Sequence, residues 1–193
     1  MKLQLLAVLL VFSAVALGAE QDSTTSRFTP GGELKRPTDY RDWVYLTSGF
    51  DMSYSSDQSP DHHMFDNVFV NPAAYRAFLQ SGTWPDGAML LIEGRAGVTR
   101  GSINKRGSSQ ATEIMGLEVH VKDSKRFEGS WAFFAFDDDQ TAKMIPHTES
   151  CYSCHDAHAA VDTTFVQFYP TLIDTAKAKG TLSANYLRES KTQ

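Results

Sequence analysis

The chain has 193 residues, of which 41% are hydrophobic and 21% are charged, and its formal net charge is −5 at pH 7. This acidic balance gives no electrostatic basis for binding nucleic acid, because neutralising phosphates requires clustered Lys and Arg. The length suits one domain with a substantial core, for which 12 Phe, 7 Tyr and 3 Trp residues supply apolar material.

The first 19 residues have the order of a secretory signal peptide. Lys2 gives a positive start, residues 3–17 are almost entirely apolar, and small residues precede a polar run. The alternative is an uncleaved membrane anchor, but the apolar run of about 15 residues is shorter than the ~20 that span a bilayer. We therefore expect a periplasmic mature domain of residues 20–193, flexible at 20–35 and 185–193, without stable membrane association.

The segment that follows the flexible start predicts a short helix and then a loop. Thr38 can cap a short helix that carries Tyr40, Trp43, Val44 and Tyr45 and ends near Gly49. Residues 51–63 are rich in Ser, Asp and Pro, and this composition is typical of a loop.

A strand and a well-delimited helix are predicted next. Residues 68–70 are β-prone, and Asn71 followed by Pro72 marks the start of a helix. Gly82 is suited to its left-handed end. A Pro-Asp-Gly turn at 85–87 then leads into further apolar sequence.

The second half of the chain predicts more strands and a C-terminal helix. The expected strands are residues 88–92, 117–122 and 131–136, and the Gly- and Arg-rich residues 94–109 predict a long hairpin connection. Apolar positions at helical spacing predict a helix over 163–179, kinked at Pro170. Strands and helices in separate runs favour an α+β fold, an antiparallel sheet with flanking helices.

The motif Cys151-Tyr152-Ser153-Cys154-His155 has the C-x-x-C-H spacing of covalent haem attachment. Two thiols three residues apart can add to the two vinyl groups of one porphyrin, and the adjacent histidine is then held beneath the iron. A redox dithiol would need a βαβ context, a zinc site two more ligands, and a disulfide here would close a tiny loop. The motif therefore predicts one haem c on Cys151 and Cys154, with His155 as axial ligand.

A sixth iron ligand is not obvious from the sequence. Met64 and Met115 remain open as candidates, whereas four other histidines are predicted to be surface residues. These histidines are His62, His63, His120 and His147.

Longer stretches around these motifs resemble the cytochrome P-460 family. They occur in the family's order over nearly the whole mature chain, at residues 40–45, 67–72, 84–87, 116–123, 131–134 and 151–170. The resemblance implies an antiparallel sheet with helices, a c-type haem near the C-terminus, five-coordinate iron and a homodimer.

Two branches of this family differ in chemistry. Members named cytochrome P-460 oxidise hydroxylamine and carry an extra covalent link from the haem to a lysine. Relatives named cytochrome c′-beta lack the link and bind nitric oxide at an open iron position under apolar side chains, often phenylalanines. The resemblance places the lysine directly before Glu93, where this chain has Ile92, and no lysine lies between Lys35 and Lys105.

The resemblance also implies a distal glutamate that moves protons, for which Glu118 is the best match and Glu113 the alternative. We expect an open distal site for small nitrogen oxides, nitric oxide first and also hydroxylamine, with Phe65, Phe69 and Ile92 as its apolar wall. One alternative is a hydroxylamine or nitric oxide oxidoreductase that uses Glu118. Another is an electron-transfer cytochrome with a methionine sixth ligand, serving a periplasmic redox partner protein.

Overall fold

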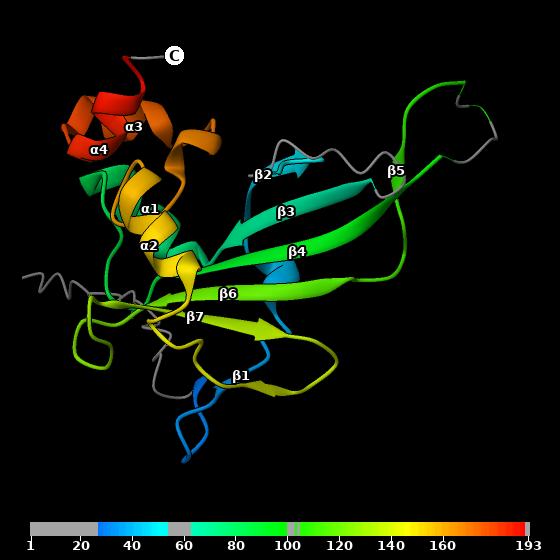
Figure 1. Cartoon of the computed structure of the whole chain (residues 1–193), viewed down its shortest axis with the longest axis horizontal. Helices are drawn as coiled ribbons and strands as arrows, with labels where there is room; N and C mark the ends of the chain where they lie inside the picture. Colours follow the sequence, from blue (N-terminus) through cyan, green and yellow to red (C-terminus); the bar gives the residue numbers. More distant parts are fainter. Residues whose placement is uncertain (1–26, 54–62, 100–102, 104, 192–193) are drawn as a thin grey trace, which may run out of the picture.

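The computed structural model describes residues 27–53, 63–99, 103 and 105–191. It confirms the α+β fold, with antiparallel sheets and separate helices (Figure 1). The predicted signal peptide, residues 1–19, lies outside the described residues. Within the part that is described, no helix has both the length and the apolar character needed to cross a membrane.

A six-stranded antiparallel sheet forms the centre of the molecule. Its strands follow the order β2-β3-β4-β6-β7, and β5 pairs with β4 outside this path. The strands are β2 (Val44–Phe50), β3 (Met64–Val70), β4 (Met89–Val98), β5 (Ser109–Gln110), β6 (Gly116–Lys122) and β7 (Trp131–Phe136). A second, two-stranded sheet pairs β1 (Leu34–Lys35) with β8 (Thr141–Ala142).

The α-helices of the described residues gather at one end of the large sheet (Figure 1). They are α1 (Pro72–Ser81), α2 (Ser150–His158), α3 (Ile173–Lys179) and α4 (Ala184–Glu189). The predicted ends of α1 are confirmed, because Asn71 is extended, Pro72 is the first helical residue, and Gly82 ends the helix with a φ of 77°. The Asn71 side chain accepts a 2.9 Å hydrogen bond from the Met89 amide and so ties the start of α1 to β4.

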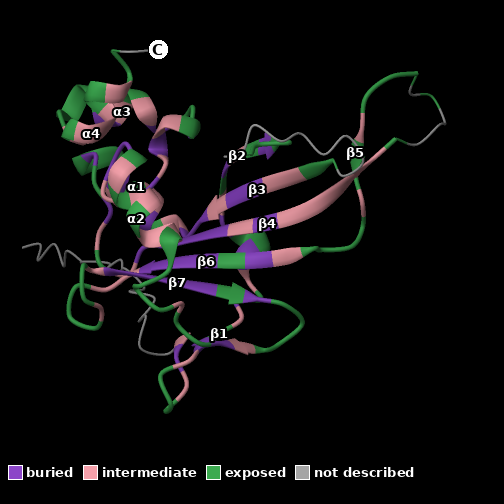
Figure 2. Cartoon of the chain, in the orientation of Figure 1, coloured by how far each residue is buried: buried purple, intermediate pink, exposed green. Residues whose placement is uncertain are grey.

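Both faces of the sheet are covered close to the helices, as the buried colouring of the strands shows (Figure 2). On the helix side, Val70, Leu90 and Phe133 pack with residues of the helices and their loops. On the opposite side, Leu91 and Phe134 belong to a second cluster that also contains residues of β1 and β8. Because successive strand residues alternate between the faces, β4 and β7 contribute to both clusters.

Some local predictions are wrong because tertiary pairing overrides local preference. Residues 40–45 form a 3-10 helix at Tyr40–Asp42 and then enter β2, where Val44 pairs with Val70 of β3. The expected hairpin connection at 94–109 is shorter, because β4 continues to Val98 and pairs with β5.

The C-terminal helix is also divided. A 3-10 helix at Val166–Phe168 precedes α3, and Pro170 separates them because it lacks an N–H and disfavours helical backbone at Tyr169. Parts of both ends for which we expect flexibility make tertiary contacts in the structure. Leu34 is fully buried, and α4 packs on α2, where Asn185 donates a 3.1 Å hydrogen bond to the Asp156 carbonyl.

Candidate functional site

The C-x-x-C-H motif lies on α2, which begins directly before it. Cys151 and Cys154 are three residues apart on this helix, so their thiols share one helix face. The Tyr152 ring between them stacks on Phe133 of β7 at 4.3 Å, and its hydroxyl donates a 3.0 Å hydrogen bond to the Ile145 carbonyl. These contacts fix α2 against the sheet and hold both thiols and the adjacent His155 in place.

His155 is held in one orientation by its backbone partner. Its Nδ1 lies 2.8 Å from the Thr163 carbonyl oxygen, an acceptor, so Nδ1 carries the proton and Nε2 is left unprotonated. Burial lowers the pKa of His155, which favours the neutral ring, although the Thr163 hydrogen bond acts in the opposite direction. A neutral imidazole with Nδ1 bonded to a carbonyl is the usual state of a metal-ligating histidine.

Aromatic rings surround His155. The Phe165 ring centroid lies 4.2 Å away, that of Phe133 4.8 Å and that of His120 4.9 Å. The prediction that His120 is a surface residue is wrong, because it is 7% exposed and stacked on Phe133. Burial, together with the neighbouring His155, lowers the pKa of His120 to about 3, so this ring stays uncharged at neutral pH.

His155 and both cysteines line a cavity of about 530 Å³ between α2 and the helix side of the sheet. This volume lies within the range of roughly 300–1,000 Å³ that cofactor and ligand pockets occupy. Two thiols, a neutral imidazole and a largely apolar lining are the donor set and surroundings that a covalently attached haem requires, so these residues fit that group. Among the described residues, no group of three or more His, Cys, Asp and Glu is placed to hold a metal ion by itself.

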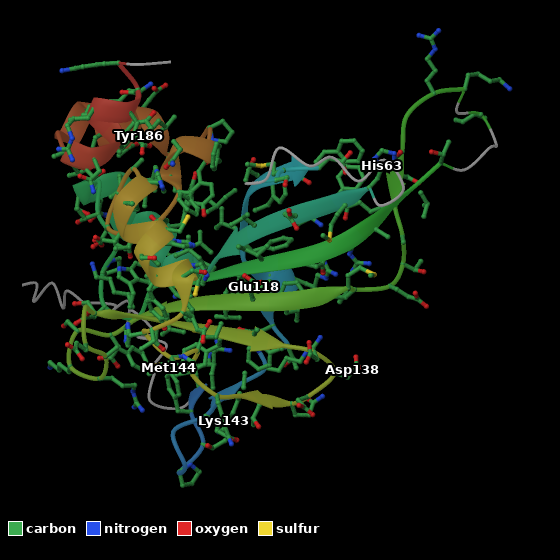
Figure 3. The ribbon with its side chains drawn as sticks, in the orientation of Figure 1. His63, Glu118, Asp138, Lys143, Met144 and Tyr186 are labelled. Carbon is green, nitrogen blue, oxygen red and sulfur yellow. The ribbon has the colours of Figure 1, made fainter. Side chains whose placement is uncertain are left out.

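The wall opposite α2 is built by adjacent strands in register, β2, β3, β4 and β6. Val68 of β3 pairs with Ile92 of β4, which in turn pairs with Glu118 of β6, and all three side chains line the cavity. Glu118 lies near the middle of the sheet (Figure 3). Two residues that the sequence singled out separately, Ile92 and Glu118, are therefore direct cross-strand neighbours.

The prediction that Phe65 and Phe69 belong to this wall is wrong. Side chains alternate along β3, so the strand that directs Val68 into the cavity directs Phe65 and Phe69 to the other face. Phe65 packs on Phe50 at 4.6 Å, and Phe69 packs edge-on against Tyr40 at 5.6 Å. These aromatic side chains support the sheet from behind.

A second carboxylate, Asp66, lines the cavity beside Glu118 and was missed in the sequence. Gly94 of β4 pairs with Asp66 of β3 and lies between that strand and β6, where a Cβ added to it would be in van der Waals contact with Oδ1 of Asp66 at 3.9 Å. Burial raises the pKa of Glu118, and the Asp66 charge raises it further; burial also raises the pKa of Asp66. Asp66 lies two residues before Val68, and residues two apart on a strand face the same side, so this alternation could have identified Asp66.

The two methionines considered as sixth ligands do not line the cavity. Met64 is 43% exposed at the start of β3, and Met115 is 64% exposed just before β6. Met52, just after β2, does line it. His63 is exposed at the far end of the sheet from the helices, where its Nδ1 lies 2.7 Å from Oδ2 of Asp51 (Figure 3). His62 lies outside the described residues. Glu113, the alternative to Glu118 as proton acceptor, is exposed.

A family model described as Cytochrome P460 matches residues 37–166, which include the whole six-stranded sheet and the C-x-x-C-H motif. No curated protein matches the chain. The match covers more than half of the sequence and contains the cavity wall, the thiols and the histidine described above. The chain therefore belongs to the cytochrome P460 family, and it is a haem cytochrome.

Proposed function

We propose that the cavity holds a single haem c, attached through thioethers to Cys151 and Cys154 and ligated at its iron by Nε2 of His155. The placement of all three side chains on one cavity supports this assignment. When bound, the haem supplies an iron centre that binds small ligands and exchanges electrons. The protein's own residues orient that centre and decide what can approach it.

The site binds small nitrogen oxides, nitric oxide first, beside the cavity wall that the sheet forms. The observation that carries this proposal is the position of Ile92 at the centre of the cavity wall, in register with Val68. These two apolar side chains suit a neutral diatomic ligand, because neither offers a polar group that would offset the desolvation of a charged one. The neighbouring carboxylates of Glu118 and Asp66 repel anions. Within this family, an isoleucine at the position of the linking lysine also favours a ligand-binding role.

Covalent attachment is tested by intact mass and by extraction with acidic acetone. The wild-type protein should gain the mass of one haem and retain its colour, whereas Cys151→Ala combined with Cys154→Ala should release the haem. Ser153→Ala is a matched control, since Ser153 is an exposed residue between the two thiols on the same helix. A wild-type mass without haem would overturn the assignment.

Ligand binding is tested by absorption and resonance Raman spectra. We expect a high-spin, five-coordinate ferrous protein that binds nitric oxide readily. A low-spin, six-coordinate ferrous protein that becomes high-spin in Met52→Ala would instead support the electron-transfer function, because Met52 is the methionine that lines the cavity.

Hydroxylamine oxidation is a second candidate, favoured by the two carboxylates in the wall. The reaction requires a base for the protons that leave with the electrons, and Glu118 with Asp66 beside it presents carboxyl oxygens to the cavity. We expect slow or absent turnover in the native protein, because the lysine link is missing. Fast turnover that Glu118→Ala abolishes would favour this candidate. Oxidase activity that appears only in Ile92→Lys would instead identify Ile92 as the residue that separates the two functions.

The sequence also supports proposals about the location of the protein and the proteins that it binds. We propose that residues 1–19 direct export to the periplasm, that the mature protein forms a homodimer, and that a periplasmic redox protein exchanges electrons with it. Size-exclusion chromatography with light scattering and N-terminal sequencing of the exported protein test the first two statements.

A further inference from the structure

The carbonyl that holds His155 belongs to a strained turn. Val161 and Thr164 form an isolated antiparallel bridge, and the two residues between them, Asp162 and Thr163, have φ angles of 54° and 58°. Positive φ at both central positions marks a type I′ turn, which prefers Asn-Gly or Asp-Gly. A β-branched threonine is a poor residue at such an angle, so the turn depends on its surroundings to keep this shape.

Lys122 makes the main contacts that hold this turn in shape. Nζ of Lys122, at the end of β6, forms an ion pair with Asp162 and donates a 2.8 Å hydrogen bond to the Trp84 carbonyl. Both ion-pair partners are less than one-third exposed, so the pair is partly shielded from water. On the other side of the turn, Nε1 of Trp84 donates a 2.8 Å hydrogen bond to the Thr164 hydroxyl. The turn is thus attached at two points to the segment before β4.

We propose that Lys122 and Asp162 are positioning residues for the axial histidine, acting through the Thr163 carbonyl. The inference rests on the proposed role of His155. The ion pair keeps the turn left-handed, the left-handed turn directs the Thr163 carbonyl at Nδ1, and that hydrogen bond sets the orientation and basicity of the ring. Loosening the turn weakens the hydrogen bond and makes Nε2 a weaker donor.

Lys122→Met tests the proposal in the intact haem-loaded protein. We expect the iron–histidine stretching band in the resonance Raman spectrum to move to lower frequency. The reduction potential should become more positive, since a less basic ligand stabilises ferric iron less. Asp162→Asn should produce the same two shifts, because asparagine tolerates the turn but lacks the charge, and the double variant should add nothing further. Lys125→Met is the matched control, since Lys125 is an exposed lysine just beyond β6 and should leave both readouts unchanged.

A rescue variant separates positioning from a direct effect of charge. Thr163→Gly creates an Asp-Gly turn that adopts type I′ geometry without help. Added to Lys122→Met, it should return the stretching band to the wild-type frequency. A shift that persists in this background would show that Lys122 acts through its charge on the iron, and would overturn the proposal.

Failure of the proposal and failure of the haem assignment give different results. If His155 is not the axial ligand, the wild-type protein has no iron–histidine band for any variant to move. If the wild-type band is present but stays in place in both Lys122→Met and Asp162→Asn, the haem assignment stands and the positioning role is wrong.

Discussion

Two glutamates on adjacent strands of one sheet have opposite surroundings. Glu93 of β4 is 1% exposed, accepts 2.5 Å hydrogen bonds from the Tyr40 hydroxyl and from Nε of Arg95, and pairs with Arg41. Glu118 of β6 faces the cavity on the other side and, among the described residues, has no hydrogen bond or ion pair of its carboxylate. The two glutamates therefore differ in their hydrogen-bond and ion-pair partners, which make Glu93 a structural carboxylate and leave Glu118 available to a ligand.

The pKa shifts of the two groups express the same difference. Burial alone would raise the pKa of Glu93, but its hydrogen bonds from Arg95 and Tyr40 and the two arginine charges outweigh burial and lower it. The pKa of Tyr40 is raised to about 12, first by burial and then by its hydrogen bond to the Glu93 carboxylate. For Glu118, burial and the Asp66 charge both raise the pKa. The surroundings of the two carboxylates thus shift their pKa values in opposite directions.

The largest effect is expected from breaking the Glu93 network. Glu93→Ala leaves the largely buried Arg95 without its carboxylate and should lower the free energy of unfolding by about 3–5 kcal/mol. Because the folded pKa of Glu93 is lowered, its contribution is present above the unfolded pKa and is lost as pH falls through the folded pKa. Denaturant titration of the haem-loaded protein at neutral and acid pH measures both effects. A loss no greater than that of Glu118→Ala would contradict the comparison.

A neighbouring pair in β4 tests the two faces directly. Leu91 is fully buried on the side opposite the cavity, so Leu91→Ala should cost about 2–5 kcal/mol of stability and leave ligand affinity unchanged. Ile92→Ala should cost less and change the rates of nitric oxide binding and release, because Ile92 lines the cavity. Stopped-flow measurements of nitric oxide binding and release in both variants test this difference. Equal kinetic changes would contradict the assignment of Leu91 and Ile92 to different faces of the sheet.

The smallest effect is expected from Glu118→Gln. The folded pKa of Glu118 lies above its ordinary 4.5, so its favourable contribution is present at low pH and is lost as pH rises through the folded value. Glutamine imitates the protonated form, so the variant should match the wild type in acid and become slightly more stable than it near neutrality. Asp66→Asn should reduce this advantage, since Asp66 helps to raise the pKa. Thermal unfolding across the pH range measures it, and a variant less stable than the wild type at neutral pH would argue for an ion pair at Glu118.

Local features of the sequence predicted much of this architecture. The Asn-Pro start and Gly end of α1 and the alternation in β6 needed only neighbouring residues to be read correctly. The helix expected at 40–49 failed because β2 gains its hydrogen bonds from β3, a segment far along the chain. Backbone pairing of that kind cannot be read from a single segment.

The sequence by itself determined the spacing of the candidate haem-binding side chains, since C-x-x-C-H places two thiols and an imidazole within five residues whatever surrounds them. Only the tertiary structure decided which strand residues face the helix that carries them. A strand has two sides separated by a single residue, and the helices cover the side of Val68 rather than that of Phe69. That choice moved the aromatic side chains away from the cavity, brought Asp66 beside Glu118, and buried His120 against His155.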